Sequence, residues 1–144
     1  MSKVFRTGRV IEFSDTDAAG IVHFARYMAF METAEHQFLH SLGTDVMFEH
    51  GGNRIGLPRV SASCDYKRPL FYKDKIEIQV RVLRIGTKSV KYGFRFTRGE
   101  EETAAGSIVC ACCLINPDEP MRSIELPDFF KELIGPYLHD DAAP

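Results

Sequence analysis

The stretch FSDTDAAGIVHFARY, residues 13–27, leads from a strand-like segment through a turn into the longest helical pattern of the sequence. Asp15 and Asp17 precede the turn, and the Ala-Ala-Gly tripeptide that ends at Gly20 gives the backbone freedom to reverse. The helical pattern then begins at Phe24. The stretch therefore places a carboxylate beside a helix N-terminus, where unpaired backbone N–H groups and the helix dipole favour negative charge.

The helical pattern covers residues 24–42, because apolar residues recur there every three or four positions and Gly43 supplies a C-terminal cap. At 1.5 Å per residue, a helix of roughly 19 residues would be about 29 Å long. Residues 25–31 are apolar on almost every side, so we expect other structure to wrap the first half of the helix. Glu32 and Glu35 are expected on a helix face directed toward solvent or an interface.

Strand-like segments precede and follow this helix. Residues 4–13 are rich in β-branched and aromatic residues, and residues 76–82 and 90–97 alternate between apolar and polar side chains. Residues 57–68 are also predicted to form a strand. In residues 104–115 both the odd- and the even-numbered positions are mainly apolar, which is typical of a central strand covered on both faces. We expect the four strands after the helix to follow one another in successive hairpins.

Two further segments complete the expected fold. Residues 44–56 have no clear period and contain Gly-Gly-Asn, so we interpret them as a mobile connection with one helical turn at residues 45–50. Residues 127–134 form a short helix that starts at a proline. The fold class is α+β, with an antiparallel sheet of about five strands wrapped around one long helix. A dimer would cover the open sheet edge.

Length and charge restrict the protein class. The 144 residues fit one domain, which we place at residues 1–139, followed by a flexible tail at residues 140–144. A formal net charge of −2 provides no broad basic field, which argues against nucleic acid as a partner. No apolar run is long enough for a signal peptide or a membrane span, so we predict a cytoplasmic protein.

The four cysteines are interpreted as buried thiols that pack as small hydrophobic groups. They are Cys64, Cys110, Cys112 and Cys113. In a strand, residues 110 and 112 would share one face while residue 113 would point to the other, so one metal ion could not easily bind all three. We therefore expect no metal and no redox cofactor.

The sequence resembles the hotdog-fold acyl-CoA thioesterases of the 4-hydroxybenzoyl-CoA thioesterase family in the pattern D-x-D-x-x-G-x-V-x-F-x-x-Y. This pattern is formed by Asp15, Asp17, Gly20, Val22, Phe24 and Tyr27. Residues 56–61 resemble the second strand of that family, Lys88-Ser89 the start of its third hairpin, and residues 124–127 its ending. The resemblance thus covers nearly the whole chain.

The resemblance implies a hotdog fold and an enzyme that hydrolyses an acyl-CoA thioester to free acid and coenzyme A. The coenzyme A thioester would be the substrate, and the protein would form a homodimer or homotetramer with its pocket between subunits. Asp17 is the implied catalytic carboxylate, which either attacks the thioester or activates water. Backbone N–H groups at the helix start would stabilise the oxygen as it becomes negative. The oxyanion and orienting residues would be Gly20, Val22, His23 and Phe24.

The substrate-binding residues follow from the same resemblance. The acyl pocket would include Tyr27, Met31 and Val60, with core packing as an equal alternative for Tyr27. The residues that bind coenzyme A would be Arg59, Lys88 and Ser89.

Each of these interpretations has an alternative. Asp17 could serve an ordinary Asx turn or helix cap, and a structural turn is the expected role of Asp15. A noncatalytic acyl-binding module would keep the pocket without hydrolysis. A hotdog dehydratase or hydratase would need a histidine paired with a carboxylate at the β-carbon of the substrate, and only His23 lies close in sequence. The position of Asp17 in the helix-opening pattern favours hydrolysis.

Overall fold

The computed structural model describes residues 2–139, so the expected tail at residues 140–144 lies outside the described residues. Within these residues, two α-helices and nine strands follow one another. They are β1 (Phe5–Val10), α1 (Arg26–Ser41), β2 (Met47–His50), β3 (Asn53–Gly56), β4 (Arg59–Tyr66), β5 (Lys75–Ile85), β6 (Ser89–Arg98), β7 (Glu101–Ala111), β8 (Cys113–Leu114), β9 (Arg122–Ser123) and α2 (Asp128–Ile134).

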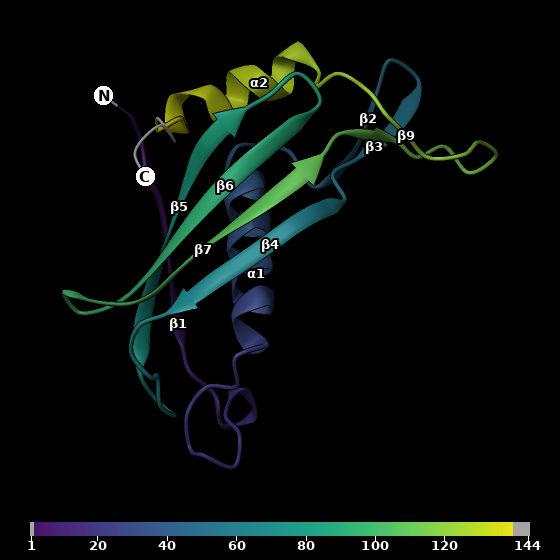
Figure 1. Cartoon of the computed structure of the whole chain (residues 1–144). Coiled ribbons are helices and arrows are strands. Elements are labelled where there is room, and N and C mark those ends of the chain that lie inside the picture. Colours follow the sequence, from purple (N-terminus) through teal and green to yellow (C-terminus); the bar gives the residue numbers. More distant parts are fainter. Residues whose placement is uncertain (1, 140–144) are drawn as a thin grey trace.

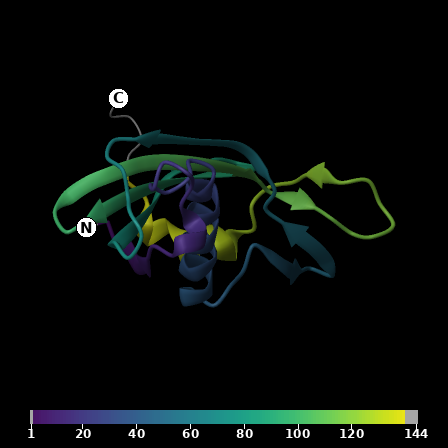
Figure 2. The ribbon, with the colours of Figure 1, turned by 90° about the horizontal axis from the view of Figure 1, so that it is seen from below.

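The main sheet has five antiparallel strands in the order β1-β5-β6-β7-β4, and α1 lies against one of its faces (Figure 1). Figure 2 shows the sheet curving over α1, as expected from the apolar first half of the helix. The expected succession of hairpins is wrong for β4, which pairs with β7 instead of β5. The chain crosses the end of the sheet between β4 and β5, where the backbone N–H groups of Lys67 and Arg68 both donate to the carbonyl of Thr103.

A second, four-stranded sheet has the order β2-β3-β8-β9. The expected mobile connection at residues 44–56 is therefore wrong, because Met47–His50 and Asn53–Gly56 form a hairpin around the Gly51-Gly52 turn. Glycine at positive φ allows this reversal. The strand expected at residues 104–115 is divided at Cys112, with β7 in the main sheet and β8 in the second sheet. β6 is the central strand of the main sheet.

Helix α1 has 16 residues and is shorter than the roughly 19 expected. The helix begins at Arg26 instead of Phe24, because Phe24 and Ala25 belong to a turn in which the Arg26 N–H donates to the His23 carbonyl. Gly43, at φ +81°, ends the helix as expected and donates its N–H to the His40 carbonyl. The buried helix residues that face the sheet include Tyr27, Phe30, Met31, Ala34, Phe38 and Leu39.

The remaining expectations have mixed outcomes. The short helix near residues 127–134 is confirmed as α2, which buries Phe130 and Ile134. Three of the four cysteines are buried free thiols, whereas Cys64 is only half-buried. Among residues 2–139, no helix is long and apolar enough to cross a membrane.

Gly106 of β7 lies close to both α1 and β4. A Cβ atom at this position would lie 2.6 Å from the Met31 Sδ and 2.7 Å from the Ser63 carbonyl oxygen. The backbone of β4 cannot move without disturbing its pairing with β7, so only a residue without a side chain fits.

We expect Gly106→Ala to lower the free energy of unfolding by about 1–3 kcal/mol through overpacking against Met31 and β4. Chemical denaturation monitored by circular dichroism measures this loss. Gly135→Ala is the matched control, because a Cβ at Gly135 meets nothing within 4 Å and its φ is −51°. Equal stabilities of the two variants would contradict this account of the helix–sheet contact.

Candidate active site

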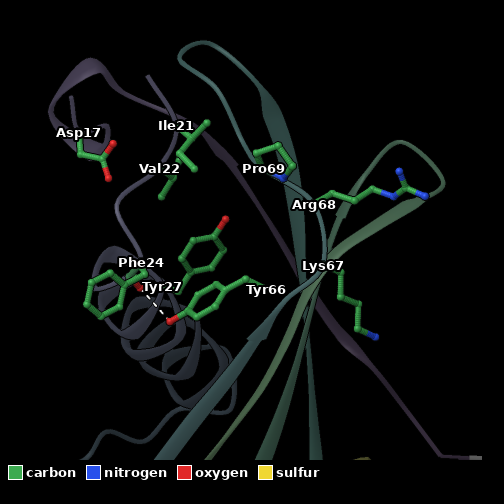
Figure 3. Close-up of a pocket in the computed structure, with 9 residues that line it drawn as sticks. All are labelled: Asp17, Ile21, Val22, Phe24, Tyr27, Tyr66, Lys67, Arg68 and Pro69. Atoms are coloured by element: carbon green, nitrogen blue, oxygen red, sulfur yellow. Dashed lines mark hydrogen bonds between the residues drawn. The ribbon is translucent and has the colours of Figure 1, made fainter. Parts of the chain in front are cut away.

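A cavity of about 510 Å³ lies at the N-terminal end of α1, between the loop that precedes the helix and the end of β4 (Figure 3). Its lining residues are Asp17, Ile21, Val22, Phe24, Tyr27, Tyr66, Lys67, Arg68 and Pro69. The structure therefore brings four of the residues expected from the sequence, namely Asp17, Val22, Phe24 and Tyr27, to one cavity.

Asp15 is fully buried and connects the loop to the helix. One carboxylate oxygen accepts a hydrogen bond from the Arg26 Nε at 3.1 Å and forms an ion pair with its Nη2 at 3.0 Å. The other oxygen accepts the Glu12 N–H at 2.8 Å. The Asp15 carbonyl accepts the His23 N–H at 2.9 Å. This geometry agrees with the structural role expected for Asp15. It fixes the loop relative to the first turn of α1.

Asp17 stands in a tight turn at the edge of the cavity. Its Oδ1 accepts the Ala19 N–H at 2.9 Å, which is the Asx-turn geometry, and its carbonyl accepts the Gly20 N–H at 2.9 Å. Gly20 has φ +81°, a conformation that favours glycine. The Asp17 Oδ2 has no hydrogen-bond partner within residues 2–139 and remains available at the cavity. The Asx turn thus orients the carboxylate through one of its oxygens.

The backbone N–H of Phe24 is the free donor at the start of α1. Within the described part of the chain it makes no hydrogen bond, whereas the N–H groups of Val22, His23 and Ala25 all have acceptors. The His23 N–H is therefore engaged by Asp15 and is not available to a substrate oxygen, although His23 was expected among the oxyanion and orienting residues. The imidazole Nδ1 of His23 accepts the Ala25 N–H at 3.1 Å, so this ring caps the helix start.

Tyr27 combines the two roles considered for it. It is only 3% exposed and packs edge-on against Phe96, yet it also lines the cavity. Burial, with smaller effects of Cys64 and Tyr66, raises the pKa of Tyr27 to about 12, so its hydroxyl stays protonated at neutral pH. In Figure 3 this hydroxyl points toward the space between Val22 and Pro69.

Four lining residues at the end of β4 were missed in the sequence. They are Tyr66, Lys67, Arg68 and Pro69. Tyr66 donates its hydroxyl to the Phe24 carbonyl at 3.0 Å, Lys67 pairs with Glu102, and Arg68 pairs with Glu101 at 3.3 Å. An aromatic residue followed by two basic residues and a proline at a strand end was the available signal. Its meaning depends on the crossing of β4 to the helix start, which the pattern does not reveal.

The other expected binding residues do not line this cavity. Met31 is buried behind it, and Val60 is 62% exposed on β4. The strand registers place Ser89 of β6 at the end of the sheet where β4 begins. Tyr66 and the cavity lie at the other end of the sheet. Lys88 directly precedes Ser89 and is exposed. Within one chain, these residues are therefore separated from the cavity.

Glu35 is fully buried and ion-paired, which corrects the expectation of a solvent or interface face. Its two carboxylate oxygens accept hydrogen bonds from the Arg59 guanidinium, one of them at 3.1 Å. Arg59 also contacts the half-exposed Glu32 at 3.3 Å. Burial raises the pKa of Glu35, and Arg59 opposes this shift by stabilising the carboxylate. The guanidinium expected to bind coenzyme A is already paired with two carboxylates.

The paired Arg59 and Glu32 line two further hollows on the same side of α1. One, of about 430 Å³, lies between the helix and the second sheet. The other, of about 360 Å³, is formed mainly by small and apolar residues of α1, β4 and β7, including Ala25 directly after Phe24. Among residues 2–139, no three His, Cys, Asp or Glu side chains are arranged to hold a metal ion.

We expect Glu35→Ala to lower the free energy of unfolding by about 3 kcal/mol, because Arg59 would lose its buried partner. The double variant Glu35→Ala/Arg59→Met should be less destabilised than the sum of the two single variants, since it leaves no unpaired buried charge. Urea denaturation of the four proteins gives the coupling energy. A coupling energy of zero would contradict the buried ion pair.

Sequence comparison identifies relatives of the whole fold. The profile of the thioesterase-like superfamily matches residues 11–134 of this chain. The 1,4-dihydroxy-2-naphthoyl-CoA hydrolase of Synechococcus elongatus is 32% identical over 106 residues, which cover 72% of this chain and 77% of that protein.

Solved structures of two thioesterases share the fold of this chain. The 1,4-dihydroxy-2-naphthoyl-CoA thioesterase from Synechocystis superposes with a TM-score of 0.79 at 19% identity, over 92% of this chain and 96% of that chain. A gentisyl-coenzyme A thioesterase superposes with a TM-score of 0.74 at 26% identity, over 92% of this chain and 99% of that chain. The similarity therefore extends far beyond the helix-opening pattern.

Proposed function

The chain belongs to the thioesterase-like superfamily, and we propose that it hydrolyses an acyl-CoA thioester to a free acid and coenzyme A at the cavity beside α1. One observation carries the proposal. Asp17 and Phe24 line the same cavity, and within residues 2–139 one Asp17 carboxylate oxygen and the Phe24 backbone N–H have no hydrogen-bond partner. Thioester hydrolysis needs these two groups, one for the carbonyl carbon and one for its oxygen.

In the proposed mechanism, the thioester carbonyl oxygen accepts the Phe24 N–H. As the tetrahedral intermediate forms, negative charge develops on this oxygen, and the N–H at the positive end of the α1 dipole stabilises it. A single donor of this kind contributes about 10²- to 10³-fold to the rate. The Asp17 Oδ2 either attacks the carbonyl carbon or removes a proton from the attacking water. Gly20 permits the turn that holds Asp17 beside the helix start.

The lining of the cavity favours an aromatic acyl group. Phe24, Tyr27 and Tyr66 provide aromatic surfaces, and about 510 Å³ lies within the usual range of roughly 300 to 1,000 Å³ for ligand pockets. Two of the relatives carry names that refer to aromatic acyl-CoA substrates, a dihydroxynaphthoyl-CoA and gentisyl-CoA. We therefore propose a planar aromatic acyl-CoA as the preferred substrate.

We propose that the active form is a homo-oligomer in which two β4 edges pair. β4 is the last strand of the main sheet, and its outer edge pairs with no strand among residues 2–139. Antiparallel pairing of two β4 strands would bring the start of one strand beside the end of the other. This would carry the partner's Lys88 and Ser89 toward the cavity, where a coenzyme A phosphate could bind. A cytoplasmic location and hydrolysis without a metal or redox cofactor remain predictions.

The alternatives differ in what they require of the cavity. A dehydratase or hydratase needs a histidine that acts with a carboxylate on the substrate, but the Nδ1 of His23 is occupied by Ala25 and His23 does not line the cavity. A noncatalytic acyl-binding module would bind the same ligands without releasing thiol.

We expect Asp17→Asn to lower kcat by about 10²- to 10⁴-fold, because the amide can neither accept a proton nor attack the carbonyl carbon. The measurement is thiol release from acyl-CoA in a colorimetric assay. Asp118→Asn is the matched control, since Asp118 is exposed in the loop between β8 and β9. Wild-type kcat in Asp17→Asn would exclude the proposed mechanism.

A panel of benzoyl-CoA, butyryl-CoA and palmitoyl-CoA tests the activity and the substrate class together. We expect benzoyl-CoA to give the highest kcat/KM, because its ring matches the aromatic lining. Treatment with EDTA should leave this rate unchanged. Binding of all three compounds without thiol release would support the noncatalytic module instead, and a preference for palmitoyl-CoA would contradict the aromatic substrate class.

A further inference from the structure

The backbone carbonyl of Phe24 accepts a hydrogen bond from Tyr66, a side chain of the sheet that has no role in the proposed mechanism. The hydroxyl of Tyr66 donates to this carbonyl at 3.0 Å, whereas the Tyr27 N–H in the first turn of α1 reaches the same oxygen only at 3.4 Å. The Tyr66 bond is therefore the shorter of the two. Figure 3 shows this bond spanning from β4 to the helix start.

Tyr66 is itself held in place from two sides. Its backbone pairs with Ala104 of β7, so the residue belongs to the regular part of the sheet. Its ring packs edge-on against Tyr27, with ring centroids 4.9 Å apart and an interplanar angle of 73°. Tyr66 is 46% exposed, and its partial burial, together with a smaller effect of Cys64, raises its pKa, so the hydroxyl remains a protonated donor at neutral pH.

Phe24 has few other anchors. Its side chain is 65% exposed, and its N–H has no acceptor within residues 2–139. Only the φ and ψ angles of Phe24 separate its N–H from its carbonyl, because the adjacent peptide units are planar. Restraint of the carbonyl therefore also restricts the direction of the N–H. Besides the Tyr66 bond, Phe24 has the longer bond from the Tyr27 N–H and the stacking of its ring on His23, with ring centroids 4.8 Å apart.

We propose that Tyr66 is a positioning residue, which holds Phe24 in the orientation in which its N–H meets the developing oxyanion. This inference rests on the proposed function of the cavity and adds a role for β4. The hydrogen bond connects the outermost strand of the sheet to the donor at the helix start. The effect of Tyr66 should therefore fall on the transition state more than on substrate binding.

The first test is Tyr66→Phe, which removes the hydroxyl and keeps the ring against Tyr27. We expect kcat to fall about 3- to 10-fold, as for the loss of one neutral hydrogen bond, with KM changed less than about twofold. The matched control is Tyr72→Phe, because Tyr72 is exposed and does not line the cavity. A raised KM with unchanged kcat, or equal losses in both variants, would overturn the positioning role.

The second test measures polarisation of the thioester directly. The probe is the panel member that is hydrolysed fastest, labelled with ¹³C at its carbonyl and bound to Asp17→Asn so that it persists. Infrared difference spectroscopy should show a carbonyl stretch at lower frequency than in free acyl-CoA, because the Phe24 N–H donates to the oxygen. In the double variant Asp17→Asn/Tyr66→Phe this frequency shift should be smaller, so that the carbonyl stretch lies closer to that of free acyl-CoA.

The outcomes separate the inference from the function on which it rests. An equal frequency shift in both proteins would refute the role of Tyr66 and leave the Phe24 donor in place. No frequency shift in Asp17→Asn itself would refute the Phe24 donor, and the role of Tyr66 with it. Circular dichroism of the double variant establishes that a lost shift does not result from unfolding.

Discussion

The geometry of the candidate site depends on the buried carboxylate of Asp15. Asp15 joins three parts of the chain. Its carboxylate accepts hydrogen bonds from the Arg26 side chain of α1 and from the Glu12 N–H, and its backbone carbonyl accepts the His23 N–H. A buried carboxylate is stable only when it is paired and hydrogen-bonded, so the loop has little freedom to move relative to the helix. Of the N–H groups near the helix start, Asp15 engages that of His23, and the N–H of Phe24 has no acceptor within residues 2–139.

Strand β4 provides a second set of constraints on the helix. Near its start, Arg59 forms an ion pair with the buried Glu35 in the middle of α1, and at its end Tyr66 binds the carbonyl of Phe24. Two contacts thus fix the helix to the edge strand, one in the middle of the helix and one at its start. Because this strand is also the proposed contact between two copies of the chain, assembly and the geometry of the helix start would be physically linked.

The sequence was sufficient to predict features that depend on local patterns. Alternation and helical spacing predicted most strands of the main sheet and the helix α1. The resemblance to the thioesterase family implied that Asp17, Phe24 and Tyr27 meet at the helix start. Features that depend on long-range pairing were missed. The pairing of β4 with β7, and hence the arrival of Tyr66 at the cavity, follows from sheet topology. Burial of Glu35 requires Arg59, which lies 24 positions away in sequence.

A crystal structure of Asp17→Asn with the preferred acyl-CoA bound tests the proposed site most directly. The thioester oxygen should lie about 2.7–3.1 Å from the Phe24 backbone nitrogen, which is the range for an effective oxyanion donor. The carbonyl carbon should face the side chain at position 17, and the acyl group should contact Tyr27. A thioester bound in the hollow beside Glu32 and Arg59, with its carbonyl away from Phe24, would contradict the account.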